Sequence, residues 1–402
     1  MSDGFFARSK VKSKQPQSKI PKCGQCKLNK GCISPQMPYT GEGKKKILII
    51  AEAPGLAEDE QNTQLIGDAG KLLRKLLRKC KIDLDKDCWK TNAVICRPPK
   101  NRTPVDKEIV ACRPYLFKTI EETKPNVIIP LGATAVKSLI DIVWGDPADS
   151  LSRWLGQKIP CQTLNAWICP TYHPSYLLRT KNTTAELITK RHLKAACRLK
   201  NSPWRITNPS SVPDYKKDIT IEHSPRLAAK WLKEKREYGC ATFDYETNML
   251  KPDSELAEID CCSVCFNNKR TIAFPWHGEV IDAMIDLFKS PIKKIAANIK
   301  FEDRWTRRIL KTKIRNWHWD TVLAAHILNH KPGVSGTKFQ AFVQLGQQRY
   351  DKHLDNYLKG PSSNEPNRIK ELDLDDRLIY CGMDSLVEHK IAMIQMKEFG
   401  IK

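Results

Sequence analysis

Short apolar runs alternate with amphipathic stretches along the first half of the chain. Residues 47–51 read Ile-Leu-Ile-Ile-Ala and are followed by a Pro-Gly stop, which is typical of a buried parallel strand. Residues 70–81 place four leucines among lysines and arginines, which predicts an amphipathic helix with a basic outer face. Further strands are predicted over 125–132 and 166–169, with a helix over 133–140. This alternation predicts a layered α/β domain whose site lies at the carboxyl ends of the strands.

The alternation of apolar runs and amphipathic stretches is interrupted once, at residues 201–218, and then continues. Residues 201–218 contain Ser-Pro-Trp, Asn-Pro-Ser-Ser and Val-Pro-Asp with little periodicity, which predicts a linker. A strand over 219–222 and a helix over 225–235 follow, and a second α/β unit begins at Ala241. We therefore predict four segments: a disordered basic arm (1–18), a first domain (19–200), the linker (201–218) and a second domain (219–402).

Composition narrows the class of protein. The length of 402 residues exceeds one domain of about 100–200 residues. Lysine and arginine number 68 against 45 acidic residues, and the net charge of +23 favours a nucleic-acid partner over a surface that is basic only for solubility. Fifteen cysteines without a signal peptide predict a reducing cytoplasm. No apolar run approaches the roughly 20 residues that span a bilayer, so no membrane partner is expected.

Four cysteines in the first third of the chain are candidate metal ligands. They are a close pair, Cys23 and Cys26, and the later Cys96 and Cys112. Thiolates in such sets ligate iron-sulfur clusters. A zinc site, or thiols that pack as small apolar groups, would use the same residues. Cysteine spacing alone leaves these alternatives open.

The surrounding motifs resemble the iron-sulfur group of the uracil-DNA glycosylase superfamily, often called family four. The resemblance covers about residues 19–198 and implies a three-layer α/β fold in which the four cysteines hold a structural [4Fe-4S] cluster. Enzymes of this kind draw a base out of the stack into a pocket. The motifs are Ala51-Glu52-Ala53-Pro54-Gly55, Thr91-Asn92, Cys96-Arg97-Pro98-Pro99 and His173-Pro174-Ser175-Tyr176-Leu177-Leu178-Arg179.

The same resemblance implies a role for each polar residue of these motifs. Asn92 would read the uracil edge, because a carboxamide supplies both a donor and an acceptor. His173 would stabilise the negative charge that develops on the leaving base, and Glu52 would position the attacking water. Ser175 and Arg179 would contact DNA phosphate.

Two positions depart from the family pattern. The first motif usually opens with glycine, where this chain has Ala51. Leu65 stands where a phenylalanine normally stacks on the flipped uracil, a contact worth about 1–3 kcal/mol. Excision is therefore expected to be slow, altered in base preference or absent. A pocket that binds DNA or senses uracil without cutting is the alternative.

Acidic residues recur in the second half of the chain. Asp244 and Glu246 alternate on a predicted strand and share a face. Glu302 and Asp303 follow an Asn-Ile-Lys-Phe sequence. Residues 380–384 span one helical turn, so that a tyrosine and an aspartate share a face. Carboxylates gathered from several elements are costly unless divalent metal ions neutralise them, and two such ions can assist phosphodiester hydrolysis.

This ordered set resembles the proofreading 3′-to-5′ exonuclease domain of family A DNA polymerases, in its tyrosine-containing subclass with a ribonuclease H-like fold. By that resemblance two Mg²⁺ (or Mn²⁺) ions bind to Asp244, Glu246 and Asp384, while Tyr380 orients the attacking water. The second motif offers both Glu302 and Asp303, of which position favours Glu302. Asp320 is expected to be structural, and Cys261, Cys262 and Cys265 are expected to be core residues on a strand.

The combined pattern looks like the N-terminal part of certain bacteriophage replicative polymerases. The chain ends soon after Asp384, so the polymerase palm and fingers are not expected. We predict a DNA replication or repair protein of the cytoplasm, or of the host cytoplasm if phage-encoded. Its exonuclease would act on single strands or 3′ ends beside a separately encoded DNA polymerase. In the alternative, the glycosylase-like domain of this exonuclease subunit only binds DNA or senses uracil.

Overall fold

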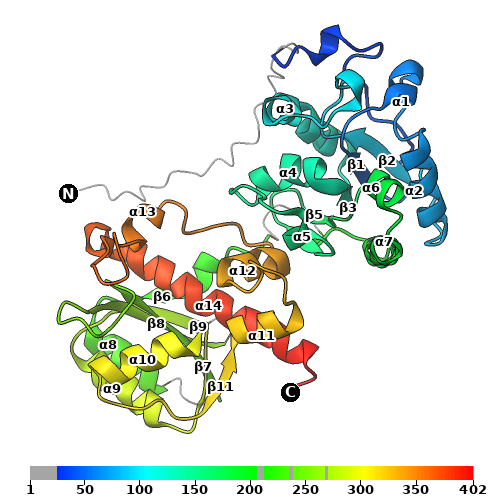
Figure 1. The fold of residues 1–402 in the computed structure, drawn as a ribbon. Coiled ribbons are helices and arrows are strands. Elements are labelled where there is room, and N and C mark those ends of the chain that lie inside the picture. Colours follow the sequence, from blue (N-terminus) through cyan, green and yellow to red (C-terminus); the bar gives the residue numbers. More distant parts are fainter. Residues whose placement is uncertain (1–24, 206–211, 235–238, 268–269, 402) are drawn as a thin grey trace. The chain divides into compact units, whose positions relative to one another are not determined.

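The structure is a computed structural model whose contacts divide the chain into two compact units, residues 1–206 and 207–402 (Figure 1). The division falls inside the segment predicted as a linker. The last turn of that segment, Tyr215–Asp218, is a 3-10 helix whose tyrosine is buried in the C-terminal unit. The predicted basic arm and Cys23 lie outside the described residues. The structure describes residues 25–205, 212–234, 239–267 and 270–401.

A five-stranded sheet forms the middle layer of the N-terminal unit. Its order is β2-β1-β3-β5-β4, with four parallel strands and β4 antiparallel at one edge. Strands β1 and β3 are buried at every position, because helices cover both faces of a parallel sheet. The strands are β1 (Ile47–Ala51), β2 (Cys88–Asn92), β3 (Val127–Pro130), β4 (Ile159–Cys161) and β5 (Ala166–Ile168).

Two helical layers enclose this sheet. Helices α2, α6 and α7 pack together on one face, and α3, α4 and α5 lie on the other (Figure 1). The leucines of α2 pack against alternate residues of β1 and β3, which is the amphipathic arrangement predicted from the sequence. The predicted three-layer α/β fold is confirmed. The helices are α1 (Leu56–Gln61), α2 (Asp68–Arg78), α3 (Asp106–Thr123), α4 (Gly132–Val143), α5 (Leu151–Trp154), α6 (Pro174–Thr180) and α7 (Thr183–Ala196).

The C-terminal unit contains a mixed six-stranded sheet in the order β11-β10-β7-β8-β9-β6. Strands β7, β8 and β9 form an antiparallel meander, and β10 and β11 extend it in parallel with β7. The second α/β domain predicted from the sequence is confirmed. The strands are β6 (Ile219–Ile221), β7 (Cys240–Thr247), β8 (Ile259–Asn267), β9 (Arg270–Pro275), β10 (Lys293–Ala296) and β11 (Trp317–Asp320).

Helices also cover both faces of the second sheet. The long helix α14 contacts five of the strands, and α11 and α12 pack against it. Helices α8, α9 and α10 contribute to a core on the opposite face. The helices are α8 (Pro225–Glu234), α9 (Glu279–Lys289), α10 (Ile299–Ile309), α11 (Thr321–Leu328), α12 (Thr337–Leu345), α13 (Asp355–Leu358) and α14 (Leu374–Glu398).

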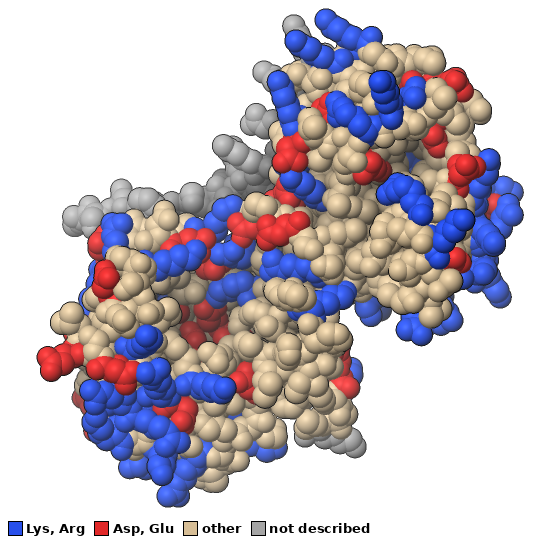
Figure 2. All heavy atoms as spheres, viewed as in Figure 1, with Lys and Arg blue, Asp and Glu red and all other residues tan. Residues whose placement is uncertain are grey.

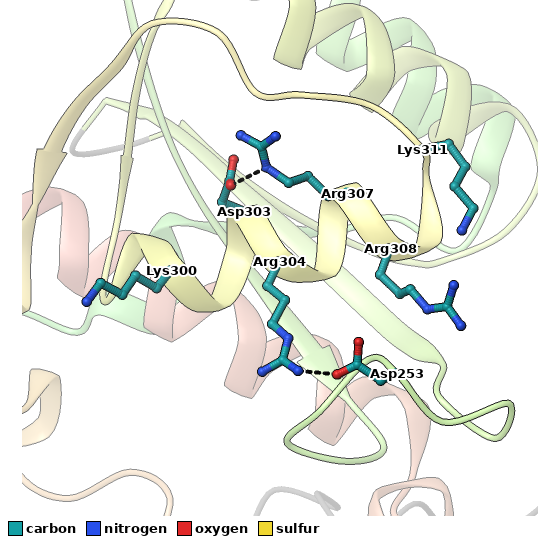
Figure 3. Close-up of a pocket in the computed structure, with 7 residues that line it drawn as sticks. All are labelled: Asp253, Lys300, Asp303, Arg304, Arg307, Arg308 and Lys311. Carbon is teal, nitrogen blue, oxygen red and sulfur yellow. Dashed lines mark hydrogen bonds and ion pairs between the residues drawn. The ribbon is translucent and has the colours of Figure 1, made fainter.

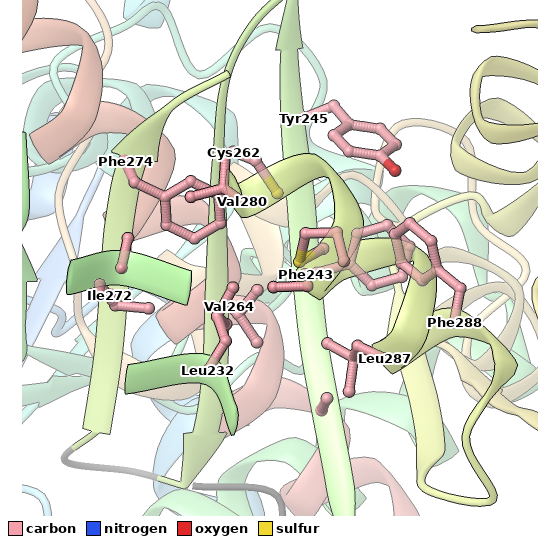
Figure 4. Close-up of a cluster of buried hydrophobic side chains, with 14 of the residues drawn as sticks. Leu232, Phe243, Tyr245, Cys262, Val264, Ile272, Phe274, Val280, Leu287 and Phe288 are labelled. Atoms are coloured by element: carbon pink, nitrogen blue, oxygen red, sulfur yellow. The ribbon is translucent and has the colours of Figure 1, made fainter. Parts of the chain in front are cut away.

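An aromatic cluster fills the core beneath β7 (Figure 4). The ring centroid of Phe243 lies 4.9 Å from that of Phe288 and 5.4 Å from that of Tyr245. Since side chains alternate across a strand, this packing turns the residues between them to the other face of β7. The cysteines of β8 are fully buried, as predicted. No helix among the described residues combines the length and apolar character needed to cross a bilayer.

Candidate active sites

The first candidate site lies where the parallel strands of the N-terminal sheet end. Asn92 closes β2 and pairs in register with Ala51, the last residue of β1, so Glu52 follows directly beside it. Beyond β5, Thr171 bridges to Leu131. The topology therefore gathers the motif residues at one edge of the sheet, which is where an α/β fold binds ligands.

Short contacts fix two of these side chains. The hydroxyl of Thr134 donates to Glu52 Oε2 at 2.7 Å, which orients the carboxylate at the start of α4. Gly132 has a φ of +79°, and a Cβ there would lie 2.9 Å from His173 Cβ. Only glycine accommodates both the left-handed backbone and this approach. The chain after β3 thus supports both Glu52 and His173.

His173 is held as a neutral imidazole. Its Nδ1 accepts from the Ser175 backbone N–H at 3.2 Å and lies 2.7 Å from the Ser175 hydroxyl. An accepting Nδ1 leaves the ring proton on Nε2. Burial, with a smaller contribution from the Arg179 guanidinium, lowers the pKa of His173 to about 4. Arg179 also donates to the Ser175 hydroxyl at 3.2 Å, so Ser175 links the exposed arginine to the histidine.

The buried carboxamide of Asn92 donates to Gln64 Oε1, and Gln64 in turn donates to the Pro38 carbonyl at 3.1 Å. Leu65 comes next, buried and with a left-handed backbone. A Cβ on Gly70 would lie 1.7 Å from the Leu65 carbonyl oxygen, so this loop packs directly on the start of α2. Sequence reasoning missed Gln64, although its position beside Leu65 offered a hint.

The described cysteines of the predicted cluster lie together. Cys96 and Cys112 are buried and Cys26 is half-buried in one small apolar cluster that includes Leu28 and Ile109. The Gln36 backbone N–H donates to Cys96 Sγ at 3.3 Å. Soft sulfur ligands, an apolar surround and an N–H donor to sulfur suit an iron-sulfur cluster.

A further cysteine, Cys32, packs half-buried against the same apolar cluster, and sequence reasoning missed it. The buried Asp59 of α1 accepts from the backbone N–H groups of Ile33 at 3.1 Å and Ser34 at 2.8 Å. These bonds tie the cysteine-bearing segment to the helix that follows the first motif.

The second candidate site lies on the α14 face of the C-terminal sheet. One carboxylate oxygen each of Asp244 and Glu246 and the sulfur of Cys381 lie within 4.8 Å of one another. Burial and the nearby Asp384 carboxylate raise the pKa of Asp244 to about 8. Burial and Asp244 raise the pKa of Glu246 and of Glu302 well above the usual range of a glutamate.

The two acids of the second motif have different surroundings. Glu302 is 2% exposed, and its Oε2 is buried with no hydrogen-bond partner among the described residues. Asp303 instead accepts from Arg307 on the outer face of α10 and from Trp317 Nε1 at 3.3 Å. Asp320 caps α11 and also accepts from two backbone N–H groups at the start of α10, which agrees with the structural role expected for it.

Helix α14 supplies three groups at intervals of four residues: Tyr380, Asp384 and Glu388. Burial and Asp384 raise the pKa of Tyr380 well above its ordinary value, so its hydroxyl keeps its proton at neutral pH. Sequence reasoning missed Glu388, which is 3% exposed. Burial and Asp244 raise the pKa of Glu388, and its Oε2 is likewise buried without a hydrogen-bond partner among the described residues.

A half-buried lysine from α12 also enters this site, and sequence reasoning missed it. Lys338 forms an ion pair with Asp384, and its Nζ donates to the Tyr350 hydroxyl at 3.0 Å. The Nζ atom also lies 4.7 Å from the ring centroid of Tyr380. Burial alone would lower the pKa of Lys338, but Asp384 and Asp351 raise it above the usual value.

The donor set fits divalent metal ions. Asp384 raises the pKa of Asp244, and Asp244 raises the pKa of Glu246 and Glu302, so carboxylates from β7, α10 and α14 lie close together. One buried oxygen each of Glu302 and Glu388 has no hydrogen-bond partner among the described residues. Hard oxygen ligands of this kind are those that Mg²⁺ and Mn²⁺ prefer. The structure thus brings together every exonuclease residue singled out from the sequence except Asp303.

Several known proteins are similar to parts of this chain. The type-4 uracil-DNA glycosylase of Thermotoga maritima is 36% identical over 187 residues, which are 44% of this chain and 89% of that protein. A DNA polymerase of Bacillus phage SP01 is 24% identical over 403 residues, and the chain spans 40% of its length. The catalytic core of RRP6 from Trypanosoma brucei has a TM-score of 0.36 and 13% identity, covering 48% of this chain and 49% of that one.

A protein-family model also matches the part of the chain that is similar to the glycosylase. The model of the uracil DNA glycosylase superfamily matches residues 37–198, which include Glu52, Asn92 and His173. These residues also meet at the carboxyl edge of the N-terminal sheet. The chain therefore belongs to the uracil-DNA glycosylase superfamily, and its relatives there include type-4 enzymes.

Proposed function

We propose that the C-terminal unit is a metal-dependent 3′-to-5′ DNA exonuclease. The observation that carries this proposal is a set of carboxylates beside a protonated tyrosine: Asp244 is half-buried, and Glu246, Glu302 and Asp384 are buried. Two bound Mg²⁺ or Mn²⁺ ions would supply the charge that activates water and stabilises the leaving oxygen. The similarity to a phage DNA polymerase over 88% of the chain supports the same assignment.

Each side chain of the site has a proposed role in this reaction. Asp244, Glu246 and Asp384 would hold the metal ions, with Glu302 as the acid of the second motif. Tyr380 would orient the attacking water, because its hydroxyl keeps a proton with which to donate a hydrogen bond. Lys338 holds Asp384 and Tyr350 in place from the side of α12.

For the N-terminal unit we propose a base-binding pocket of the glycosylase type with a structural [4Fe-4S] cluster. Cys23, Cys26, Cys96 and Cys112 would hold the cluster. Neutral His173 would donate from Nε2 to the oxygen of a leaving uracil, an interaction that strengthens as negative charge develops there.

A silent pocket remains the second candidate for this unit. Leu65 offers no aromatic face to a base, and the carboxamide N–H of Asn92 is already donated to Gln64. A unit of this kind would bind DNA or sense uracil without releasing it. In both versions we propose that the protein works on DNA in the cytoplasm, as a proofreading subunit beside a separately encoded polymerase.

Glu302→Gln should lower metal-dependent shortening of a single-stranded oligonucleotide by more than about 100-fold, because it removes a buried carboxylate from the metal site. Asp303→Asn changes the adjacent residue on the outer face of α10 and should retain activity. Product lengths resolved on a denaturing gel, with Mg²⁺ and with chelator, provide the measurement. Equal losses in the two variants would contradict the assignment of Glu302.

Stabilisation by Mn²⁺ should be greater at pH 8 than at pH 6. The raised carboxylate pKa values mean that the metal-free fold binds more protons than the unfolded chain, so its stability is lost as pH rises from about 4 toward about 8. Mn²⁺ must displace those protons, and it does so more easily at high pH. Thermal unfolding with and without Mn²⁺ measures the effect, and Asp244→Asn should reduce it. A pH-independent stabilisation would count against the metal site.

Leu65→Phe should increase uracil release from a uracil-containing single strand assayed in chelator. Restored aromatic stacking of about 1–3 kcal/mol corresponds to a gain of about 5-fold to 150-fold if it acts in the transition state. Free uracil is measured by chromatography, with Asn92→Ala as the inactive control. If the unchanged protein and Leu65→Phe both release no more than that control, the pocket is silent.

Protein purified without oxygen should be brown and contain iron. Cys96→Ser should lose both the visible absorbance and the iron, because it removes a ligand, whereas Cys32→Ser should keep them. Absorption spectra and metal analysis report the outcome. A colourless protein with stoichiometric zinc would favour the zinc alternative.

A further inference from the structure

Exposed cationic side chains follow α10 away from the carboxylate site. Figure 2 shows blue side chains gathered over this part of the C-terminal unit. With two acids they line an open groove of about 470 Å³, here called the α10 groove, which Figure 3 shows in close-up. The lining residues are Asp253, Lys300, Asp303, Arg304, Arg307, Arg308 and Lys311.

The groove has an excess of unneutralised positive charge. Five cations face two carboxylates, so the net charge of the lining is +3. Arg304 pairs with Asp253, and Arg307 pairs with Asp303. Within the described residues, the side chains of the other three cations form no hydrogen bond or ion pair. They are Lys300, Arg308 and Lys311.

Spacing along the helix arranges these cations as a track. Lys300, Arg304 and Arg308 lie at intervals of four residues, which keeps them on one face of α10, and Lys311 follows just after the helix ends. At 1.5 Å per residue the row from Lys300 to Arg308 is about 12 Å long. A row of this kind suits a repeating anion better than a single one.

Both walls of the groove begin at the carboxylate site. Helix α10 carries Glu302 in its first turn, two residues after Lys300. The segment with Asp253 follows directly after β7, which carries Asp244 and Glu246. A strand lying in the α10 groove would therefore lead toward the buried carboxylates.

We propose that the α10 groove binds the phosphate backbone of the single DNA strand whose 3′ end enters the carboxylate site. This inference rests on the proposed exonuclease function. Charge alone would supply the affinity, so binding would not depend on sequence, as an enzyme that shortens any strand requires. An acidic protein is a poorer fit, because the lining residues include none of the apolar or aromatic anchors on which protein interfaces depend.

Asp253 would compete with a DNA phosphate for the guanidinium group of Arg304. Its ion pair with Arg304 joins side chains that are 57% and 54% exposed, and such pairs contribute little stability. A phosphate can therefore displace Asp253 at small cost. Removing the Asp253 charge should strengthen binding, a gain that general damage to the fold would not produce.

The test compares two matched double variants of the full chain. Arg304→Gln with Lys311→Gln removes two cations from the groove. Arg226→Gln with Lys233→Gln removes an exposed arginine and an exposed lysine, also seven residues apart, from α8. The measurement is the rate at which a thymidine oligonucleotide is shortened with Mg²⁺ across a range of salt concentrations.

The groove pair should raise KM several-fold and leave kcat unchanged. The salt slope of log kcat/KM should fall by about 1.4, at about 0.7 for each lost phosphate contact. The α8 pair should match the unchanged protein, and Asp253→Asn should lower KM. Equal slopes for the two pairs, or a loss confined to kcat, would overturn the proposal.

Binding in chelator separates failure of this inference from failure of the exonuclease assignment. Fluorescence anisotropy of a labelled thymidine oligonucleotide reports binding when nothing is cut. If no protein shortens DNA, weaker binding by the groove pair than by the α8 pair still supports the groove. Equal binding by the two pairs overturns it, whatever the activity.

Discussion

The cost of burying negative charge governs the C-terminal unit. Asp244, Glu246, Glu302 and Glu388 are removed from water with few hydrogen bonds, and each raises the pKa of its neighbours. Such an arrangement persists only if protons, a lysine or metal ions compensate it. Lys338 supplies one positive charge from α12, and the rest of the unit holds the acids together against their repulsion. The aromatic core around Phe243 provides the rigid support, because it anchors the other face of β7.

The N-terminal unit differs, because its site consists of neutral and charged polar side chains that lie beside an apolar interior. Glu52, Asn92 and His173 lie at the edge where the parallel strands of its sheet end. Each side chain has a hydrogen-bond partner there: Thr134, Gln64 and Ser175, respectively. His173 stays neutral because burial disfavours its charged form. The two units thus use the same low-dielectric environment in different ways: one maintains a neutral imidazole, and the other raises the pKa of its carboxylates.

Local sequence patterns predicted the residues that share one strand or one helical turn. Asp244 and Glu246 follow the two-residue period of β7, and Tyr380 and Asp384 follow the turn of α14. Apolar periodicity likewise predicted β1, β3, β5, α2 and α4 of the N-terminal unit and β6 and α8 of the C-terminal unit. Lys338, Tyr350 and Gln64 were not, because tertiary packing alone places them beside their partners. The choice between Glu302 and Asp303 also needed the structure, since only burial distinguishes two adjacent acids.

Helix α14 carries a tyrosine, an aspartate and a glutamate along one face at four-residue intervals. An insertion of one residue between them would rotate everything after it by about 100° around the helix axis, turning later acids away from the site. We expect substitutions to be tolerated on the solvent-facing side of this helix. We do not expect insertions or deletions to be tolerated between these three positions. We expect insertions and deletions to accumulate instead between α12 and α14, where the chain includes only the short helix α13 and a 3-10 turn. The regular geometry of the helix therefore fixes the spacing of Tyr380, Asp384 and Glu388.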